Sequence, residues 1–312
     1  MWRSAAFILA TSVSMTSIHA GEPAISNQTV SNQTLPNETT YQQQVSHWQA
    51  GRLRRLTAAD GWLTLIGLEW LQPGSNTLGR AEHNSIVLKA GPADFGRITL
   101  TPDGTTTLEF APGIHGRVDG REVSGAVLLG DQDGAREPSL VEVGSISLFV
   151  IDRDGRKGLR IKDAEAPSRS HFQGLDYFPI DPAWRIEARW VPFDPPHSLP
   201  IGSVLGTVSD TPVPGKAVFE KDGHRYELYP IQEAPDSLFF IIADRTSGKE
   251  TYGAARFITT GLPHDGHLTI DFNEAYNPPC AFTAYATCPL PPPENRLDLR
   301  VTAGEKKYRG EH

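Results

Sequence analysis

The sequence predicts a mainly β protein with two domains, and three observations lead to this prediction. Glycine and proline contribute 29 and 25 of the 312 residues and interrupt the chain at short intervals. The apolar segments between them are short and end in turn-forming residues, as is typical of strands in a sandwich or barrel. Only one long helical pattern occurs, near the N-terminus. We therefore expect an N-terminal β-sandwich, a C-terminal antiparallel β-barrel or sandwich, and one N-terminal helix.

Residues 1–20 have the features of a secretory signal peptide. Arg3 supplies a positive charge, an apolar segment follows over residues 5–15, and we expect cleavage near Ala20. The apolar segment is too short, and too often interrupted by serine and threonine, to span a bilayer. No cysteine stands directly after the cleavage site, where a bacterial lipoprotein carries one. We therefore expect an exported protein, periplasmic or secreted, with no stable membrane anchor.

The mature chain is predicted to begin with a disordered tether over residues 21–40. The tetrapeptide Ser-Asn-Gln-Thr occurs twice there, and apolar residues are too few to offset the entropy of folding. A helix is predicted next, over residues 41–57, because Val45, Trp48, Leu53 and Leu56 recur roughly on one face. Arginines in its last turns suit the negative end of the helix dipole.

The first domain, residues 41–163, continues with eight predicted strands. Asp-Gly pairs between several of them are typical of tight hairpins. The strands are expected over residues 63–68, 85–88, 97–100, 105–110, 126–129, 139–143, 145–151 and 159–162.

A proline-rich segment, residues 164–183, is predicted to link this domain to the second domain, residues 184–312. Strands of the second domain are expected over residues 184–191, 203–208, 215–221, 225–230, 237–243, 255–260, 267–271 and 297–302. A long loop, residues 273–295, separates the last two strands and contains both cysteines and six prolines. Loops of this length are usually functional or disordered. The aromatic residues and cysteines of this one favour an ordered, packed loop.

Four runs of sequence carry a resemblance to a known family. They are residues 61–71 (GWLTLIGLEWL), 169–175 (RSHFQGL), 271–282 (DFNEAYNPPCAF) and 288–297 (CPLPPPENRL). With these runs in this order, the chain resembles the bacterial family that shares the domain of unknown function numbered 1684, over about residues 41–309. The resemblance implies an exported or lipoprotein-type bacterial protein, and it implies no particular reaction.

A second resemblance covers about residues 63–163. It rests on residues 76–80 (NTLGR), 84–88 (NSIVL) and 143–145 (VGS), which are similar to a forkhead-associated domain. The resemblance implies a β-sandwich for the first domain. Residues 90–97 lack the Ser-x-x-His pair with which such domains bind phosphothreonine, so it implies no phosphopeptide recognition.

The two cysteines, Cys280 and Cys288, lie eight residues apart in the long loop. In an oxidising compartment we expect them to form a disulfide, which would stabilise the fold by roughly 2–3 kcal/mol. Free thiols and a shared metal are the alternatives. The spacing does not match a zinc knuckle, in which cysteine pairs lie two to four residues apart, and no metal site is predicted.

Polar residues at the ends of second-domain strands form the predicted ligand site. Asp244 and Arg256 end and begin neighbouring strands, where they could pair across a hairpin in a structural role. If the polar residues converge at one barrel mouth, they would suit a polar or anionic ligand. The alternative is that they fix the cysteine loop to the sheet. The ligand-binding candidates are Arg256, Asp271, Asn273, Tyr276 and Asn277.

An enzyme is a second hypothesis. Histidine is a common general base in enzymes, so His171 could act as a base with Asp244 or Asp271, in a hydrolase for a polar or envelope-derived substrate. A hydrogen bond that locks the surrounding loop is the alternative role for His171. The motifs of serine hydrolases, zinc proteases and nucleotide-binding proteins do not occur, so no cofactor is expected.

The charge balance argues against a nucleic-acid partner. Lysine and arginine number 29 against 37 aspartates and glutamates, whereas phosphate-backbone binding needs clustered positive charge. The leading hypothesis is an exported protein that binds a small polar or anionic ligand, or an envelope partner, through its C-terminal domain. The hydrolase and a structural envelope factor without a ligand are the alternatives.

Overall fold

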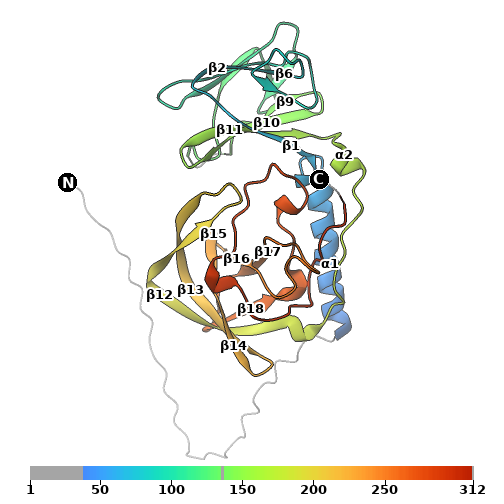
Figure 1. Ribbon diagram of the computed structural model, residues 1–312, viewed down its shortest axis with the longest axis vertical. Coiled ribbons are helices and arrows are strands. Elements are labelled where there is room, and N and C mark those ends of the chain that lie inside the picture. Colours follow the sequence, from blue (N-terminus) through green and yellow to red (C-terminus); the bar gives the residue numbers. More distant parts are fainter. Residues whose placement is uncertain (1–37, 135–136, 311–312) are drawn as a thin grey trace, which may run out of the picture. The chain divides into compact units, whose positions relative to one another are not determined.

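The mainly β prediction is confirmed by a computed structural model with 45% strand and 14% helix. The structure describes residues 38–134 and 137–310 (Figure 1). The predicted signal peptide and most of the predicted tether lie outside the described residues. Helix α1 (Glu38–Thr57) begins three residues before the predicted start. None of the described helices is long and apolar enough to cross a membrane.

The first eleven strands form a β-sandwich with one core. The order is β1-β11-β10-β9-β6-β7 in a six-stranded sheet and β3-β2-β4-β5-β8 in a five-stranded sheet. Side chains of both sheets, such as Leu148 and Leu159 from one and Leu78 and Ile98 from the other, are buried in a single cluster. The strands are β1 (Leu65–Trp70), β2 (Gly74–Gly79), β3 (Ile86–Val87), β4 (Gly96–Leu100), β5 (Thr106–Phe110), β6 (Gly116–Val118), β7 (Arg121–Val123), β8 (Gly125–Leu128), β9 (Val141–Val143), β10 (Ile146–Arg153) and β11 (Arg156–Asp163).

The C-terminal strands form two antiparallel sheets around a second core. The order is β14-β13-β12-β18 in one sheet and β15-β16-β17 in the other, and the two make a half-barrel. Phe240, Ile270 and Phe272 are fully buried inside it with other large apolar side chains, so the interior is a packed core. The strands are β12 (Arg185–Gly202), β13 (Val208–Lys221), β14 (His224–Leu228), β15 (Ile231–Ala234), β16 (Ser237–Ile242), β17 (Arg256–Gly261) and β18 (His267–Asp271).

Asp-Gly pairs close several hairpins with the turn geometry that the sequence predicts. In four of them, both the aspartate and the glycine have positive φ, which a two-residue type I′ turn requires. One of these turns joins β10 to β11, and another joins β13 to β14. The four pairs are Asp119-Gly120, Asp154-Gly155, Asp222-Gly223 and Asp265-Gly266.

Two predicted strands are wrong. Residues 203–208 form the turn of the long β12–β13 ribbon, in which Ser203 N–H donates to the Thr207 carbonyl (2.9 Å). Residues 297–302 bury alternate side chains, as a strand would, but join no sheet. Their backbone carbonyls instead accept isolated hydrogen bonds. The Leu299 carbonyl accepts from Arg245 N–H (3.0 Å), and the Val301 carbonyl accepts from the Arg256 side chain (3.2 Å).

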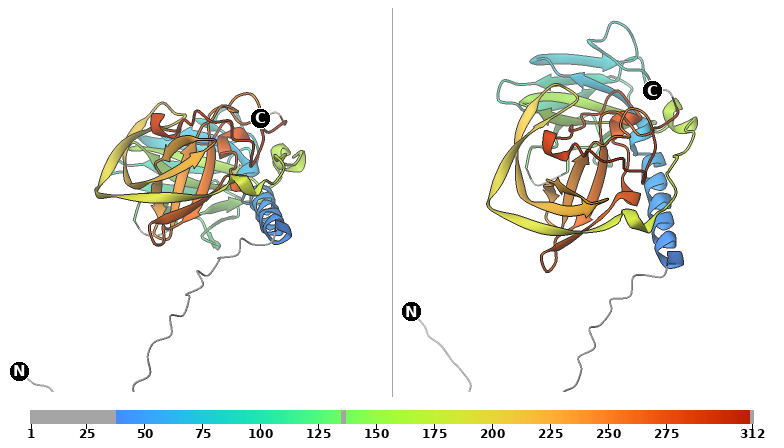
Figure 2. Two further views of the ribbon diagram at one scale, coloured as in Figure 1. Left: turned by 90° about the horizontal axis from the view of Figure 1, so that it is seen from below. Right: turned by 60° about the horizontal axis from the view of Figure 1, so that its bottom comes forward.

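Helix α1 lies alongside the C-terminal sheets in both Figure 1 and Figure 2. Its Leu56 packs on Phe282 of the cysteine loop, and its Tyr41 hydroxyl donates to Asp271 at the end of β18. The loop itself is ordered and largely buried, as predicted, with short 3-10 turns at Phe272–Glu274, Pro279–Ala281 and Pro293–Asn295. The short helix α2 (Pro167–Ser170) follows β11. The domain boundaries proposed from the sequence stay a prediction.

Candidate ligand-binding site

The structure places Arg256 and Asp244 in a buried ion pair and not at a barrel mouth. Arg256 is 2% exposed; it donates to the Asp244 carboxylate (2.5 Å) and to the Ala303 carbonyl (2.5 Å). The second Asp244 oxygen accepts from the backbone N–H and hydroxyl of Thr246 (both 2.6 Å). The pair therefore joins β16, β17 and the C-terminal segment, and both terminal nitrogens of Arg256 are engaged within the protein.

Asp271 and Asn273 lie in a second polar cluster at the end of β18. The Asp271 carboxylate accepts from the Tyr41 hydroxyl (2.7 Å) and caps the following turn through Asn273 N–H (2.9 Å). The buried Asn273 amide donates to the Tyr41 oxygen and to the Asp181 carbonyl (both 2.9 Å). Burial and the hydrogen bond to Asp271 raise the pKa of Tyr41 above its usual range. These contacts attach α1 to the half-barrel. Asp271 and Asn273 therefore have a structural role here, and they do not face a ligand site.

Asn277 belongs to a third cluster, centred on Glu305. The fully buried Glu305 carboxylate accepts from Arg52 Nε of α1 (2.9 Å) and from Asn277 N–H (2.8 Å). Arg52 Nη2 donates to the Asn277 carbonyl (2.9 Å), and the Asn277 amide donates to the Lys306 carbonyl (2.7 Å). Burial raises the pKa of Glu305, and the charge of Arg52 opposes this effect. The candidate residues are thus divided among three clusters.

Tyr276 is the one ligand-binding candidate that lines a cavity. This cavity, which we call the helix-side cavity, has a volume of about 630 Å³ and lies between α1 and the chain around Tyr276. Three aromatic side chains line it: Trp48, Trp62 and Tyr276. The Trp48 and Tyr276 ring centroids are 6.2 Å apart with the rings tilted by 49°. The volume falls within the range of small-molecule sites, about 300–1,000 Å³.

Charged side chains complete the wall of the helix-side cavity. Arg52 stacks over the Tyr276 ring (4.9 Å to the centroid), and its Nη1 has no hydrogen-bond partner among the described residues. Arg55, one turn further along α1, is exposed and forms no ion pair within residues 38–134 and 137–310. Asp60 and Glu274 also line the wall. Burial, and secondarily the charge of Asp271, raises the pKa of Glu274 to about 7.

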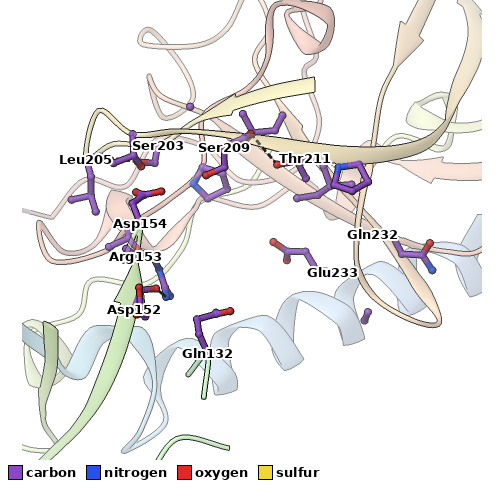
Figure 3. A pocket seen from close by; sticks show the side chains of 18 of the residues that line it. Gln132, Asp152, Arg153, Asp154, Ser203, Leu205, Ser209, Thr211, Gln232 and Glu233 are labelled. Carbon is purple, nitrogen blue, oxygen red and sulfur yellow. Dashed lines mark hydrogen bonds between the residues drawn. The ribbon is translucent and has the colours of Figure 1, made fainter. Parts of the chain in front are cut away.

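A larger cavity of about 910 Å³ lies beside the β12–β13 ribbon, and we call it the ribbon cavity. Its walls come from the ribbon, from β15, and from the β10–β11 turn at residues 152–154. Figure 3 shows Glu233 extending into the space between Gln132 and the ribbon residue Ser209. Partial desolvation raises the pKa of Glu233, which accepts no hydrogen bond from the described chain. None of the described side chains that line this cavity is aromatic.

His171 lines a third cavity, of about 690 Å³, far in the chain from both carboxylates proposed to assist it. Its neighbours on that wall include Phe282, Tyr285 and Tyr308, and no aspartate or glutamate lines the described part of the cavity. Asp244 is bonded to Arg256, and Asp271 to Tyr41. The structure therefore does not bring His171 together with either carboxylate.

Cys280 and Cys288 are both buried and free, with the sulfurs not at bonding distance. Cys280 N–H donates to Cys288 Sγ (3.2 Å). A hydrogen bond between the thiols lowers the pKa of Cys280 and, with burial, raises that of Cys288. No group of three or more metal-ligating side chains occurs among the described residues.

Sequence reasoning missed the contribution of α1 to the site. Trp48, Arg52 and Arg55 are spaced at i, i+4 and i+7, so they share one face of the helix. That spacing was readable in the sequence, but the partner surface around Tyr276 is more than 200 residues away in the chain. Only the fold shows that the helix face with Trp48, Arg52 and Arg55 lies against the surface around Tyr276.

Comparisons with known proteins agree with the family resemblance. A family model described as a protein of unknown function (DUF1684) matches residues 170–306. The chain is similar to an uncharacterized protein of Haloarcula marismortui, with 33% identity over 44% of this chain and 78% of that chain and a TM-score of 0.38. It is also similar to the FHA-2 domain of a Mycobacterium tuberculosis ABC transporter, with 28% identity over 29% of this chain and 77% of that chain and a TM-score of 0.22.

None of the curated proteins matches the chain. The family model covers the half-barrel and the cysteine loop, and it therefore includes Tyr276 and Glu274 of the helix-side cavity. Two of the sequence runs that carry the resemblance, residues 271–282 and 288–297, lie wholly within the match. Residues 170–306 of the chain therefore match the DUF1684 family of proteins of unknown function.

Proposed function

We propose that this protein binds a small anionic ligand with a flat ring in the helix-side cavity. One observation carries the proposal: the cavity combines three aromatic side chains with Arg55, a guanidinium without an ion-pair partner among the described residues. The leading sequence hypothesis, a polar or anionic ligand held by the C-terminal part, is kept. The proposed ligand site, however, is the surface that Tyr276 shares with α1, and not the surroundings of Arg256.

The chemistry of the wall favours this ligand class. Aromatic side chains bury large areas and prefer offset or edge-on contact with a second ring. Arginine is suited to carboxylates and phosphates because its guanidinium presents donors in a planar fork. Arg52 is already held in place by Glu305 and the Asn277 carbonyl, so its free Nη1 is preorganised.

Binding of 2-naphthoate, a ring-bearing carboxylate, tests the proposal by isothermal titration calorimetry. We expect Arg55→Ala to weaken binding by about tenfold or more, because a charge-assisted hydrogen bond is lost. The neighbouring Arg54→Ala is the matched control, since Arg54 is equally exposed but does not line the cavity. Equal affinity of the Arg55→Ala variant and the wild type, or no binding to the wild type, would contradict the proposal.

The affinity for 2-naphthoate should fall as pH rises from about 6 to about 8. Glu274 has a pKa of about 7, so it becomes negative over this range and repels an anion in the same cavity. Of its charged neighbours, Asp271 adds repulsion and Arg185 opposes it. Asp60, Arg52 and Arg55 share the cavity wall. We expect the affinity of the wild type to fall by about tenfold over this range, and the affinity of Glu274→Gln to stay constant. A wild-type affinity that does not change with pH would exclude this role for Glu274.

Export and a disulfide between Cys280 and Cys288 also remain part of the proposal. The apolar segment near Arg3 supports a signal peptide, and the position of Cys288 Sγ, 3.2 Å from Cys280 N, supports a bridge between neighbouring side chains. Thiol titration of denatured protein from its native compartment should find no free thiol. Two free thiols in that sample would count against the bridge, whereas intracellular expression should give two.

A further inference from the structure

The ribbon cavity differs in chemistry from the helix-side cavity. Hydroxyl groups of the ribbon line one side of it, and the carboxylates of Asp152, Asp154 and Glu233 lie on the others (Figure 3). Because it presents no aromatic wall, it offers no stacking surface for a flat apolar ring. The hydroxyl-bearing residues are Ser203, Thr207, Ser209, Thr211 and Thr287.

A buried positive charge lies directly behind this cavity. Arg160 of β11 is 7% exposed and has no carboxylate partner within residues 38–134 and 137–310. Its Nε is buried and lacks any hydrogen-bond partner there. Burial, and secondarily the charge of Arg153, lowers the pKa of Arg160 to about 10. The guanidinium lies over the Trp62 and Phe149 rings (5.1 and 5.7 Å to the centroids), which partly stabilise its charge. A buried charge without a carboxylate partner is still costly, so its presence needs an explanation.

Thr287 connects this charge to the cavity. Arg160 Nη2 donates to Thr287 Oγ1 (3.1 Å), and Thr287 lines the cavity wall. Since the oxygen is engaged as an acceptor from the guanidinium, the hydroxyl hydrogen is free to donate to a ligand. Arg153 lines the same cavity and pairs with Asp131 (2.7 Å), and the charge of Asp131 opposes only part of the lowering of the Arg160 pKa. At Thr287, the free hydroxyl hydrogen and the charge of Arg160 behind it favour an acceptor with negative charge, although Asp152 and Asp154 line the cavity beside Arg153.

We propose that the ribbon cavity is a second binding site, for a small polyhydroxylated anion such as a sugar acid. The anionic group lies toward Thr287 and Arg153, and Arg160 acts as a positioning residue that supplies charge through Thr287. The hydroxyl groups of the ligand are held by the ribbon hydroxyls and by Glu233, because hydroxyls both donate and accept whereas a carboxylate only accepts. The volume of about 910 Å³ accommodates such a ligand.

Calorimetric titration with D-glucuronate and with D-glucose tests this site. We expect the wild type to bind D-glucuronate about tenfold or more tightly than D-glucose, because only the acid compensates the charge of Arg160. Thr287→Val, which removes the hydroxyl and keeps the shape, should reduce this preference to near one. Arg160→Met should do the same, and the thermal midpoint of its ligand-free form should not fall, because an unpaired buried charge is removed.

Arg97→Met, at an exposed arginine of β4 in the other sheet of the sandwich, is the control and should keep the wild-type preference. If Arg160→Met fails to fold, the preference of Thr287→Val for D-glucuronate over D-glucose alone tests the proposal. Equal affinities for the two sugars in the wild type, no binding of D-glucuronate, or an unchanged preference in Thr287→Val would overturn the proposal. The 2-naphthoate titration is independent, so failure at one cavity leaves the other site unaffected.

Discussion

Asp244→Ala is expected to lower the free energy of unfolding by about 3–5 kcal/mol, the usual effect of breaking a buried ion pair. The substitution leaves Arg256, 2% exposed, without its charge partner. Thr246 also loses the acceptor for its backbone N–H and its hydroxyl. Urea titration followed by circular dichroism measures the change.

Two further variants separate the buried charge from a general effect of the substitution. Asp244→Leu combined with Arg256→Met removes both charges, and we expect it to recover most of the lost stability. Asp298→Ala breaks the exposed pair with Arg245 and should change stability little. If the double variant is no more stable than Asp244→Ala, the unpaired charge is not the cause of the loss.

Gly304→Ala is expected to destabilise the fold by about 2–4 kcal/mol, because positive φ and backbone overlap act together. Gly304 has a φ of +77°, and a Cβ atom there would lie 2.4 Å from the Ala275 carbonyl oxygen. This close approach holds the C-terminal segment beside Tyr276: Glu305 N–H donates to the same carbonyl (2.8 Å). Urea titration again measures the loss.

Gly248→Ala is the matched control for this position. Gly248 has a similar φ of +80°, but its added Cβ would meet nothing within 4 Å. We therefore expect Gly248→Ala to lower the free energy of unfolding by only about 1 kcal/mol, the effect of the backbone conformation alone. Equal losses at the two positions would mean that the approach of Gly304 to Ala275 contributes nothing.

The parts of the fold that depend on local chemistry were predictable from the sequence. Asp-Gly turns and apolar runs between them predicted most strands, since turn type is decided by residues that can adopt positive φ. The error at residues 297–302 has a clear physical cause. The alternation of Leu297, Leu299 and Val301 is that of a half-buried strand, but the backbone of this segment is used by Arg245 and Arg256, not by a neighbouring strand.

The candidate sites depend on contacts between distant parts of the chain, which the sequence does not encode locally. Tyr276 was predicted for its polar neighbours, yet what makes it a site residue is Trp48 and Arg52 of α1. The sequence does not predict that Arg160 is buried, because an arginine in a strand is ordinarily exposed. Only the fold shows that it is buried without a carboxylate partner among the described residues.

The indole N–H resonances of the tryptophans give the most direct test of the helix-side cavity. In a ¹⁵N–¹H spectrum during titration with 2-naphthoate, we expect saturable shifts for Trp48 and Trp62, which line the cavity. Trp184, in the half-barrel core, and Trp190, packed against it, should not move. Saturable shifts at Trp184 or Trp190, with Trp48 and Trp62 unchanged, would place the ligand elsewhere and contradict the account.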